Sequence, residues 1–133
     1  MRLLVKFMVL SSVFMFMSSA HAGFSLNDST KLSGKEMKSV HSGNLRTCEN
    51  TANGREFFNT FHPNGKLEGE NDRGQNDSGT WKINSDGAVC YSWGGTFNDG
   101  CYTMFKNPTD PKEFAYEGRS SGDFYSCSFE PIK

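Results

Sequence analysis

The chain has no cluster of positive charge. Its 14 lysines and arginines are scattered singly among 15 acidic residues, which leaves a net charge of −1. Nucleic acids and anionic membrane surfaces are bound through grouped basic side chains. The composition therefore argues against nucleic acid and anionic membrane as partners, and a small ligand or another protein remains as the expected class of partner.

Motifs for metals, cofactors and nucleophilic catalysis are also missing. No Cys-x-x-Cys pair occurs, and His41 and His62 lie far from each other and from the cysteines, so no metal site is predicted. Neither a Gly-x-Ser-x-Gly elbow nor a glycine-rich phosphate or dinucleotide loop is present, and no cofactor is expected. No catalytic residue is predicted, and a hydrolase that uses a carboxylate or His62 remains an alternative.

The chain contains no apolar run long enough to cross a bilayer. The longest, Phe7–Met17, has 11 residues, whereas a spanning helix needs about 20. Arg2 and Lys6 precede the run, and a small-residue Ala-x-Ala sequence ends it at Ala22. This layout predicts a secretory signal peptide over residues 1–22 and export to the periplasm or the cell exterior. The mature chain, residues 23–133, would form a single domain with a net charge of −3.

The four cysteines all lie in the expected mature part. An even count in a small exported domain predicts a disulfide framework, for which three pairings are possible. Alternation along adjacent strands places Cys90 opposite Cys101, on the face away from the apolar side chains. Cys48 is then left to pair with Cys127, which agrees with a barrel in which the first and last strands are neighbours.

Short apolar and aromatic runs follow one another from residue 45 onward, separated by Asn-Gly, Asp-Gly and other turn sequences. Connections this short join antiparallel neighbours, so the fold class is mainly β, a meander of about eight strands. We expect a small up-and-down β-barrel or a strongly curled sheet. The capping-box sequence Ser33–Glu36 predicts one short helix over residues 34–41, packed against one opening. The polar stretch 71–78 is predicted to be a loop.

Aromatic side chains are abundant, with 9 of the 12 phenylalanines and every tyrosine and tryptophan in the expected mature part. Most should fill the interior, but some could line a ligand cavity. The candidates are Tyr91, Trp93, Tyr102 and Tyr116. Phe97 joins them because it lies in the glycine-bounded loop 94–100, where it would either cover the barrel end or face a partner.

A block of cysteines, tryptophans and turn glycines resembles a family of small exported proteobacterial proteins catalogued as a domain of unknown function. The resemblance rests on Gly79, Trp81, Asp86, Gly87, Val89, Cys90, Trp93, Gly100, Cys101 and Tyr102, and extends upstream to Leu32–Glu36 and Phe61–Gly69. It does not include Cys48 or Cys127. The resemblance implies export and a β-rich fold, and no particular activity.

The sequence thus favours a non-enzymatic binding module of the bacterial envelope that takes a small apolar ligand or a protein. A periplasmic inhibitor of a secreted hydrolase such as lysozyme is an alternative, because inhibitors of this kind are small, disulfide-tied and mildly acidic. That alternative predicts an exposed contact loop near Phe97 or at Arg119–Asp123.

Overall fold

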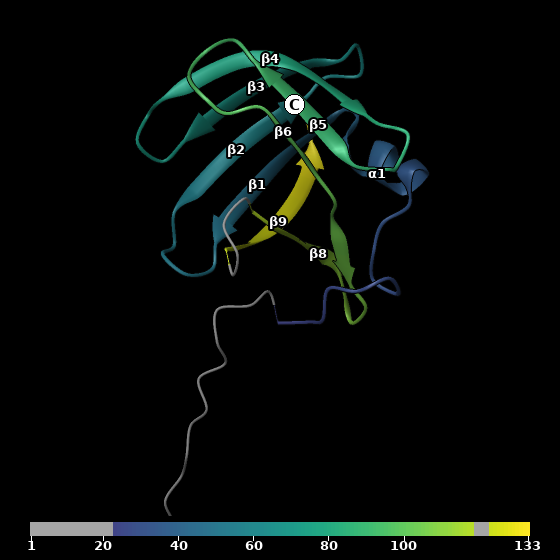
Figure 1. The fold of residues 1–133 in the computed structure, drawn as a ribbon. Coiled ribbons are helices and arrows are strands. Elements are labelled where there is room, and N and C mark those ends of the chain that lie inside the picture. Colours follow the sequence, from purple (N-terminus) through teal and green to yellow (C-terminus); the bar gives the residue numbers. More distant parts are fainter. Residues whose placement is uncertain (1–22, 119–122) are drawn as a thin grey trace, which may run out of the picture.

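The computed structural model describes residues 23–118 and 123–133. The predicted signal peptide and most of the loop 119–123 lie outside these residues. The fold is mainly β, as expected: one antiparallel sheet of nine strands curls into a half-barrel, and one short helix packs at one end (Figure 1). The described residues contain no helix with the length and hydropathy that a membrane crossing requires.

The elements follow one another as a meander. They are α1 (Gly34–His41), β1 (Asn44–Asn50), β2 (Glu56–Phe61), β3 (Lys66–Asn71), β4 (Asn76–Ile83), β5 (Val89–Trp93), β6 (Gly100–Tyr102), β7 (Phe105–Asn107), β8 (Asp110–Glu117) and β9 (Phe124–Pro131). The strand order is β6-β5-β4-β3-β2-β1-β9-β8-β7. The first and last strands are therefore neighbours, and the edges of the sheet are β6 and β7, which follow each other directly in the chain.

One of the short apolar runs of the sequence, residues 101–106, is expected to form a single strand of the meander, but it forms two short strands separated by Thr103 and Met104. Met104 is fully buried and fills the interior at this break. The segment before the helix lies along the free edge of β7, where the backbone N–H of Lys106 donates to Thr30 O at 2.8 Å and that of Leu32 donates to Met104 O at 2.9 Å. The barrel is thus left open at one seam, and the N-terminal segment covers part of the exposed strand edge.

Helix α1 begins at the predicted capping box. The N–H of Glu36 donates to Ser33 Oγ, and the Glu36 carboxylate accepts from the N–H of Ser33. The helix ends before Gly43, whose φ of +81° reverses the chain into β1. Met37 and His41 are fully buried, so the helix closes the barrel end at which β1 starts.

Both predicted disulfides are present. Cys48–Cys127 joins β1 to β9 on the inner face, where both residues are buried. Cys90–Cys101 joins β5 to β6 on the outer face. The register pairs Val89 with Tyr102, as the alternation predicts. Disulfide bonds persist in oxidising compartments, so this pair of bonds indicates an oxidising environment.

The prediction of a loop over residues 71–78 is wrong. β3 continues to Asn71 and β4 begins at Asn76, so only Asp72–Gln75 form the turn. The strand is polar here because Asn76 and Ser78 face solvent, while the inward position is occupied by Asp77, whose carboxylate binds backbone N–H groups. A polar sequence can therefore remain in a strand when its inward polar group finds donors.

Candidate functional site

The end of the half-barrel opposite α1 holds a cavity of about 280 Å³. It is bounded by inward-facing side chains of β2, β5, β6, β8 and β9 and by the loop after β5. The lining residues are Phe57, Asn59, Glu70, Asn71, Tyr91, Trp93, Phe97, Asn98, Tyr102, Tyr116 and Tyr125. The volume suits a ligand with one ring, or one group of a larger ligand, because sites for drug-sized molecules start near 300 Å³.

All five residues that the sequence singles out for ligand contact line this cavity. Their rings belong to a continuous chain of neighbours with centroids 4.8–6.1 Å apart, which we call the aromatic arc: Phe97, Trp93, Tyr91, Tyr102, Tyr116, Tyr125 and Phe57. Tyr102 and Tyr116 lie 5.3 Å apart across the open seam. Side chains thus continue the wall of the cavity where the backbone pairing between β6 and β7 is missing.

The loop after β5 forms one lip of the cavity. Phe97 packs edge-on against Trp93, with ring centroids 5.2 Å apart. The indole fits because residue 69 on β3 is glycine, where a Cβ would lie 2.5 Å from the Trp93 ring. Phe97 is therefore partly buried over the barrel end, which corresponds to the covering role rather than to a fully exposed contact.

A buried arginine lies directly beneath the cavity. Arg46, on the inner face of β1, is 0 % exposed, and its guanidinium carbon is 5.4–5.9 Å from the ring centroids of three cavity residues, Phe57, Tyr91 and Tyr116. A fourth ring, Phe61, lies 5.1 Å away on the other side. Cation–π contacts partly compensate the lost hydration of the charge.

Arg46 has no ion pair within the described part of the chain. Its Nη2 donates to Asn59 Oδ1 at 2.9 Å and its Nη1 to the Met104 sulfur at 3.6 Å, while its Nε has no partner. An arginine buried without a carboxylate is uncommon, since removal of a charge from water normally requires a counter-charge. The same charge helps to lower the pKa of buried His41 to about 3, although burial of the ring contributes more.

The floor of the cavity carries a second unsatisfied group. Tyr91 is 8 % exposed and its hydroxyl has no hydrogen-bond partner. Burial raises the pKa of that hydroxyl, and the charge of Arg46 and a side-chain contact with Arg46 oppose the rise. Asn59, 4 % exposed, uses its side-chain oxygen to accept from Arg46, so its amide N–H groups remain as donors. The floor therefore offers donors and positive charge.

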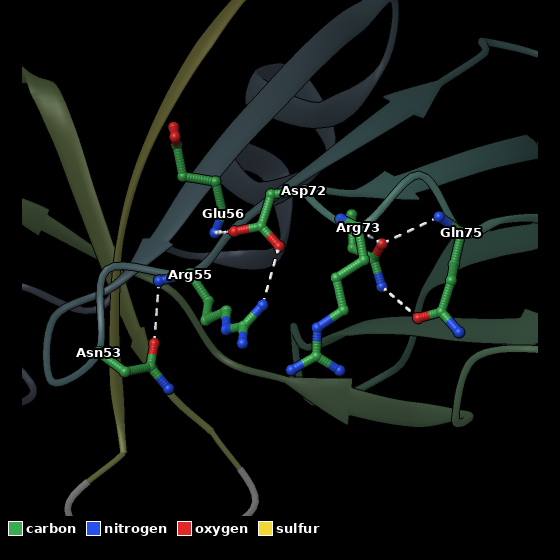
Figure 2. A network of polar contacts seen from close by, with 7 residues as sticks. Asn53, Arg55, Glu56, Asp72, Arg73 and Gln75 are labelled. Atoms are coloured by element: carbon green, nitrogen blue, oxygen red, sulfur yellow. Dashed lines mark hydrogen bonds and ion pairs between the residues drawn. The ribbon is translucent and has the colours of Figure 1, made fainter.

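The rim beside the cavity is held by a polar network between two turns (Figure 2). The Asp72 carboxylate accepts from the N–H of Glu56 at 3.0 Å and lies 3.6 Å from the Arg55 guanidinium. These contacts lower the pKa of Asp72, the backbone hydrogen bond most of all. Asn71, which lines the cavity, closes its own turn through two hydrogen bonds with Gln75. The network fixes the rim and keeps its charges in solvent.

Two larger hollows, of about 610 and 850 Å³, open on the outer face of the sheet. The first is walled by Thr80, Lys82 and Ser92 among others, and the second by Glu68 and Glu70. Both are open spaces between side chains of adjacent strands, and most of these side chains are at least partly exposed to solvent. The smaller cavity inside the barrel is therefore the better candidate site.

The residues proposed for hydrolysis lie apart from the cavity floor. His62 Nε2 is 2.6 Å from Glu68 Oε2 on the exposed β2–β3 hairpin, and this contact lowers the pKa of Glu68. The exposed Glu70 lies at the edge of the cavity, and Asp72 serves the rim network. His41 is buried between Phe61 and Phe129. Within residues 23–118 and 123–133, no group of three or more His, Cys, Asp or Glu could hold a metal.

Sequence reasoning missed Arg46 and Asn59. The signal that could have revealed Arg46 is parity: it has the same orientation in β1 as Cys48, whose pairing with Cys127 places both inside the barrel.

No family model and no curated protein matches the chain. The resemblance carried by the cysteine–tryptophan block therefore stays a prediction.

Proposed function

We propose that this protein is an exported, non-enzymatic binding module that holds a small, flat ligand in the aromatic cavity at the open end of its half-barrel. The observation that carries the proposal is the aromatic arc, whose rings form one wall around an accessible space of about 280 Å³. Aromatic side chains give large contact areas with little loss of conformational entropy, and ligand sites are typically lined in this way.

Export to the periplasm or the exterior of a bacterial cell is part of the proposal. The two disulfides support it, because they persist in oxidising compartments. Mass spectrometry of the protein from a host that processes the full-length chain tests it. A mature N-terminus at Gly23 is the expected result, and an intact Met1 in a reduced cytoplasmic protein would contradict it.

Binding is tested with a library of single-ring fragments, read by amide chemical shifts of the oxidised protein. Fragments should shift resonances of the cavity residues and alter the fluorescence of Trp93. Trp93→Ala removes one wall and should weaken the best fragment roughly fivefold or more. Phe58→Ala is the matched control, because Phe58 lies on the outward face of β2 and lines the 850 Å³ hollow. Shifts confined to that hollow, or no shifts at all, would refute the proposal.

The two other predictions of activity have less support. The His62–Glu68 pair is a possible base, but it lies on an exposed hairpin rather than in a cleft. The inhibitor alternative needs an exposed contact loop near Phe97 or at Arg119–Asp123; Phe97 packs against Trp93, and residues 119–122 are outside the described chain. Both the hydrolase and the hydrolase inhibitor stay as predictions.

A further inference from the structure

We infer that the cavity selects a ligand that carries a carboxylate on a single flat ring, and that Arg46 is the positive charge that selects it. The inference rests on the proposed function and names its ligand class. It follows from the chemistry of the cavity floor, which is independent of the ring contacts that line the walls.

The first argument is the missing counter-charge. Arg46 is fully buried, touches four aromatic rings and forms no ion pair within the described residues. Its guanidinium carbon lies 5.4–5.9 Å from the centroids of three rings that line the cavity, and its field is poorly screened there because the surroundings have a low dielectric constant. A negative group placed above Tyr91 and Tyr116 would supply the charge that the protein itself does not.

The second argument is the polarity of the floor. The Tyr91 hydroxyl is buried and has no hydrogen-bond partner among the described residues, and Tyr91 lines the cavity. Asn59 commits its acceptor to Arg46 and keeps its donors. A tyrosine hydroxyl and an amide that donate above a cation match a carboxylate, which accepts only. A cationic ligand would be repelled by Arg46.

The carboxylates near the cavity do not reverse this preference. Glu70 lies at the edge of the cavity and is exposed, so water and salt screen its charge. The Asp77 carboxylate accepts from the N–H groups of the loop that it holds, and Asp123 accepts from Asn50 and Tyr125. The interior charge nearest to the floor is positive.

Titration with phenylacetate, phenylacetamide and 2-phenylethylamine tests the inference. The three probes share one ring and differ in charge at the same position. Phenylacetate should bind about tenfold or more tightly than the amide, since hydrogen bonds to a charged group are the stronger ones. The amine should bind weakest. If the amide binds as well as the acid, the proposed cavity function stands and the inference fails. If none of the three binds, the proposed function fails with it.

Two variants test whether Arg46 and Tyr91 cause the preference for the acid over the amide. Arg46→Met should reduce the ratio of acid to amide affinity to about one, with amide binding kept. Arg73→Met, at the exposed rim, is the matched control and should leave the ratio unchanged. Tyr91→Phe is a second variant that should fold normally, because it removes a hydroxyl without a partner, and it should weaken phenylacetate alone by roughly fivefold. A full preference for the acid in both Arg46→Met and Tyr91→Phe would overturn the assignment, and if Arg46→Met does not fold, Tyr91→Phe decides alone.

Discussion

Asp77, on β4, accepts a hydrogen bond from the backbone N–H of Phe97 at 2.9 Å. Its carboxylate also accepts from the N–H groups of Thr96 at 2.7 Å and Gly95 at 3.2 Å. The pKa of Asp77 is lowered to about 2 by these donors, the bond from Phe97 most of all. One side chain therefore organises the loop that forms a lip of the cavity, and it remains ionised at any physiological pH.

Asp77→Asn should release this lip. The amide retains one acceptor but loses the negative charge that three N–H groups share, so residues 95–97 should lose order while the sheet persists. Amide hydrogen exchange at these positions should speed up at least tenfold, and the fluorescence of Trp93 should change as Phe97 leaves it.

Asp28→Asn is the control for the change of charge, because Asp28 is exposed and distant from the loop. It should leave exchange in the loop as it is in the parent protein. Equal protection of residues 95–97 in Asp77→Asn and the parent would show that the carboxylate does not hold the lip.

Gly69→Ala should displace the Trp93 and Phe97 rings at this lip of the cavity. The new Cβ would lie 2.5 Å from the Trp93 ring and 3.1 Å from the Phe97 ring, so the indole must move. Overpacking of this kind lowers the free energy of unfolding by about 1–3 kcal/mol. Gly34→Ala is the opposite control: its Cβ meets nothing closer than 3.5 Å and lies in α1, where alanine should add up to about 1 kcal/mol. Urea unfolding that ranks the two variants the other way round would contradict the packing described for Trp93.

The fold could be predicted from the sequence because its signals are local. Turn glycines such as Gly87, with a φ of +87°, separate strands at short intervals, and a meander has few alternatives once connections are this short. The pairing of Cys90 with Cys101 follows from alternation along two neighbouring strands. The split of residues 101–106 into two strands could not be predicted, since it depends on burial of Met104 at the seam.

The site could be predicted only in part. Tyr91, Trp93 and Tyr102 were identifiable because alternation along a strand assigns faces, and aromatic residues on an inner face meet across a narrow barrel. Arg46 and Asn59 were missed because a polar residue in a strand ordinarily faces solvent, although Arg46 has the same orientation in β1 as Cys48. Their burial depends on the register of β1 against both β2 and β9, which is a property of the closed arrangement rather than of either segment alone.

The buried His41 should make the protein less stable in mild acid. Its pKa is lowered to about 3, mainly because burial disfavours the charged ring, so the folded state binds this proton far less readily than the unfolded state, whose histidine titrates near 6.5. Stability is then highest above pH 6.5 and falls as the pH drops from 6.5 toward 3. The full loss from this one group is on the order of 5 kcal/mol.

His41→Leu removes this titration while the carboxylates of the chain stay the same. The slope of unfolding free energy against pH, measured between pH 7 and 4.5, should be shallower in the variant than in the parent protein. Parallel curves for the two proteins would show that the ring is accessible to protons in the folded state.

The two disulfides should differ in their contribution and in their accessibility to reductant. Cys48 and Cys127 are 79 residues apart and buried, whereas Cys90 and Cys101 are 11 apart and Cys101 is exposed. On a chain-entropy basis the longer loop contributes about 4 kcal/mol and the shorter about 3 kcal/mol, and loss of the buried pair also opens a small void in the core. The double alanine variant of Cys48 and Cys127 should therefore be the less stable of the two.

Partial reduction distinguishes the two disulfides without mutation. A mild thiol reductant added to the folded protein should open Cys90–Cys101 first, because this bond lies on the outer face and Cys101 is exposed, while Cys48–Cys127 should resist until the sheet unfolds. Alkylation of the free thiols followed by peptide mass mapping identifies the order. Labelling of Cys48 and Cys127 ahead of Cys90 and Cys101 would contradict this order. It would mean that β1 and β9 separate before the β5–β6 hairpin opens, so that the pairing of β1 with β9 is the least stable part of the sheet.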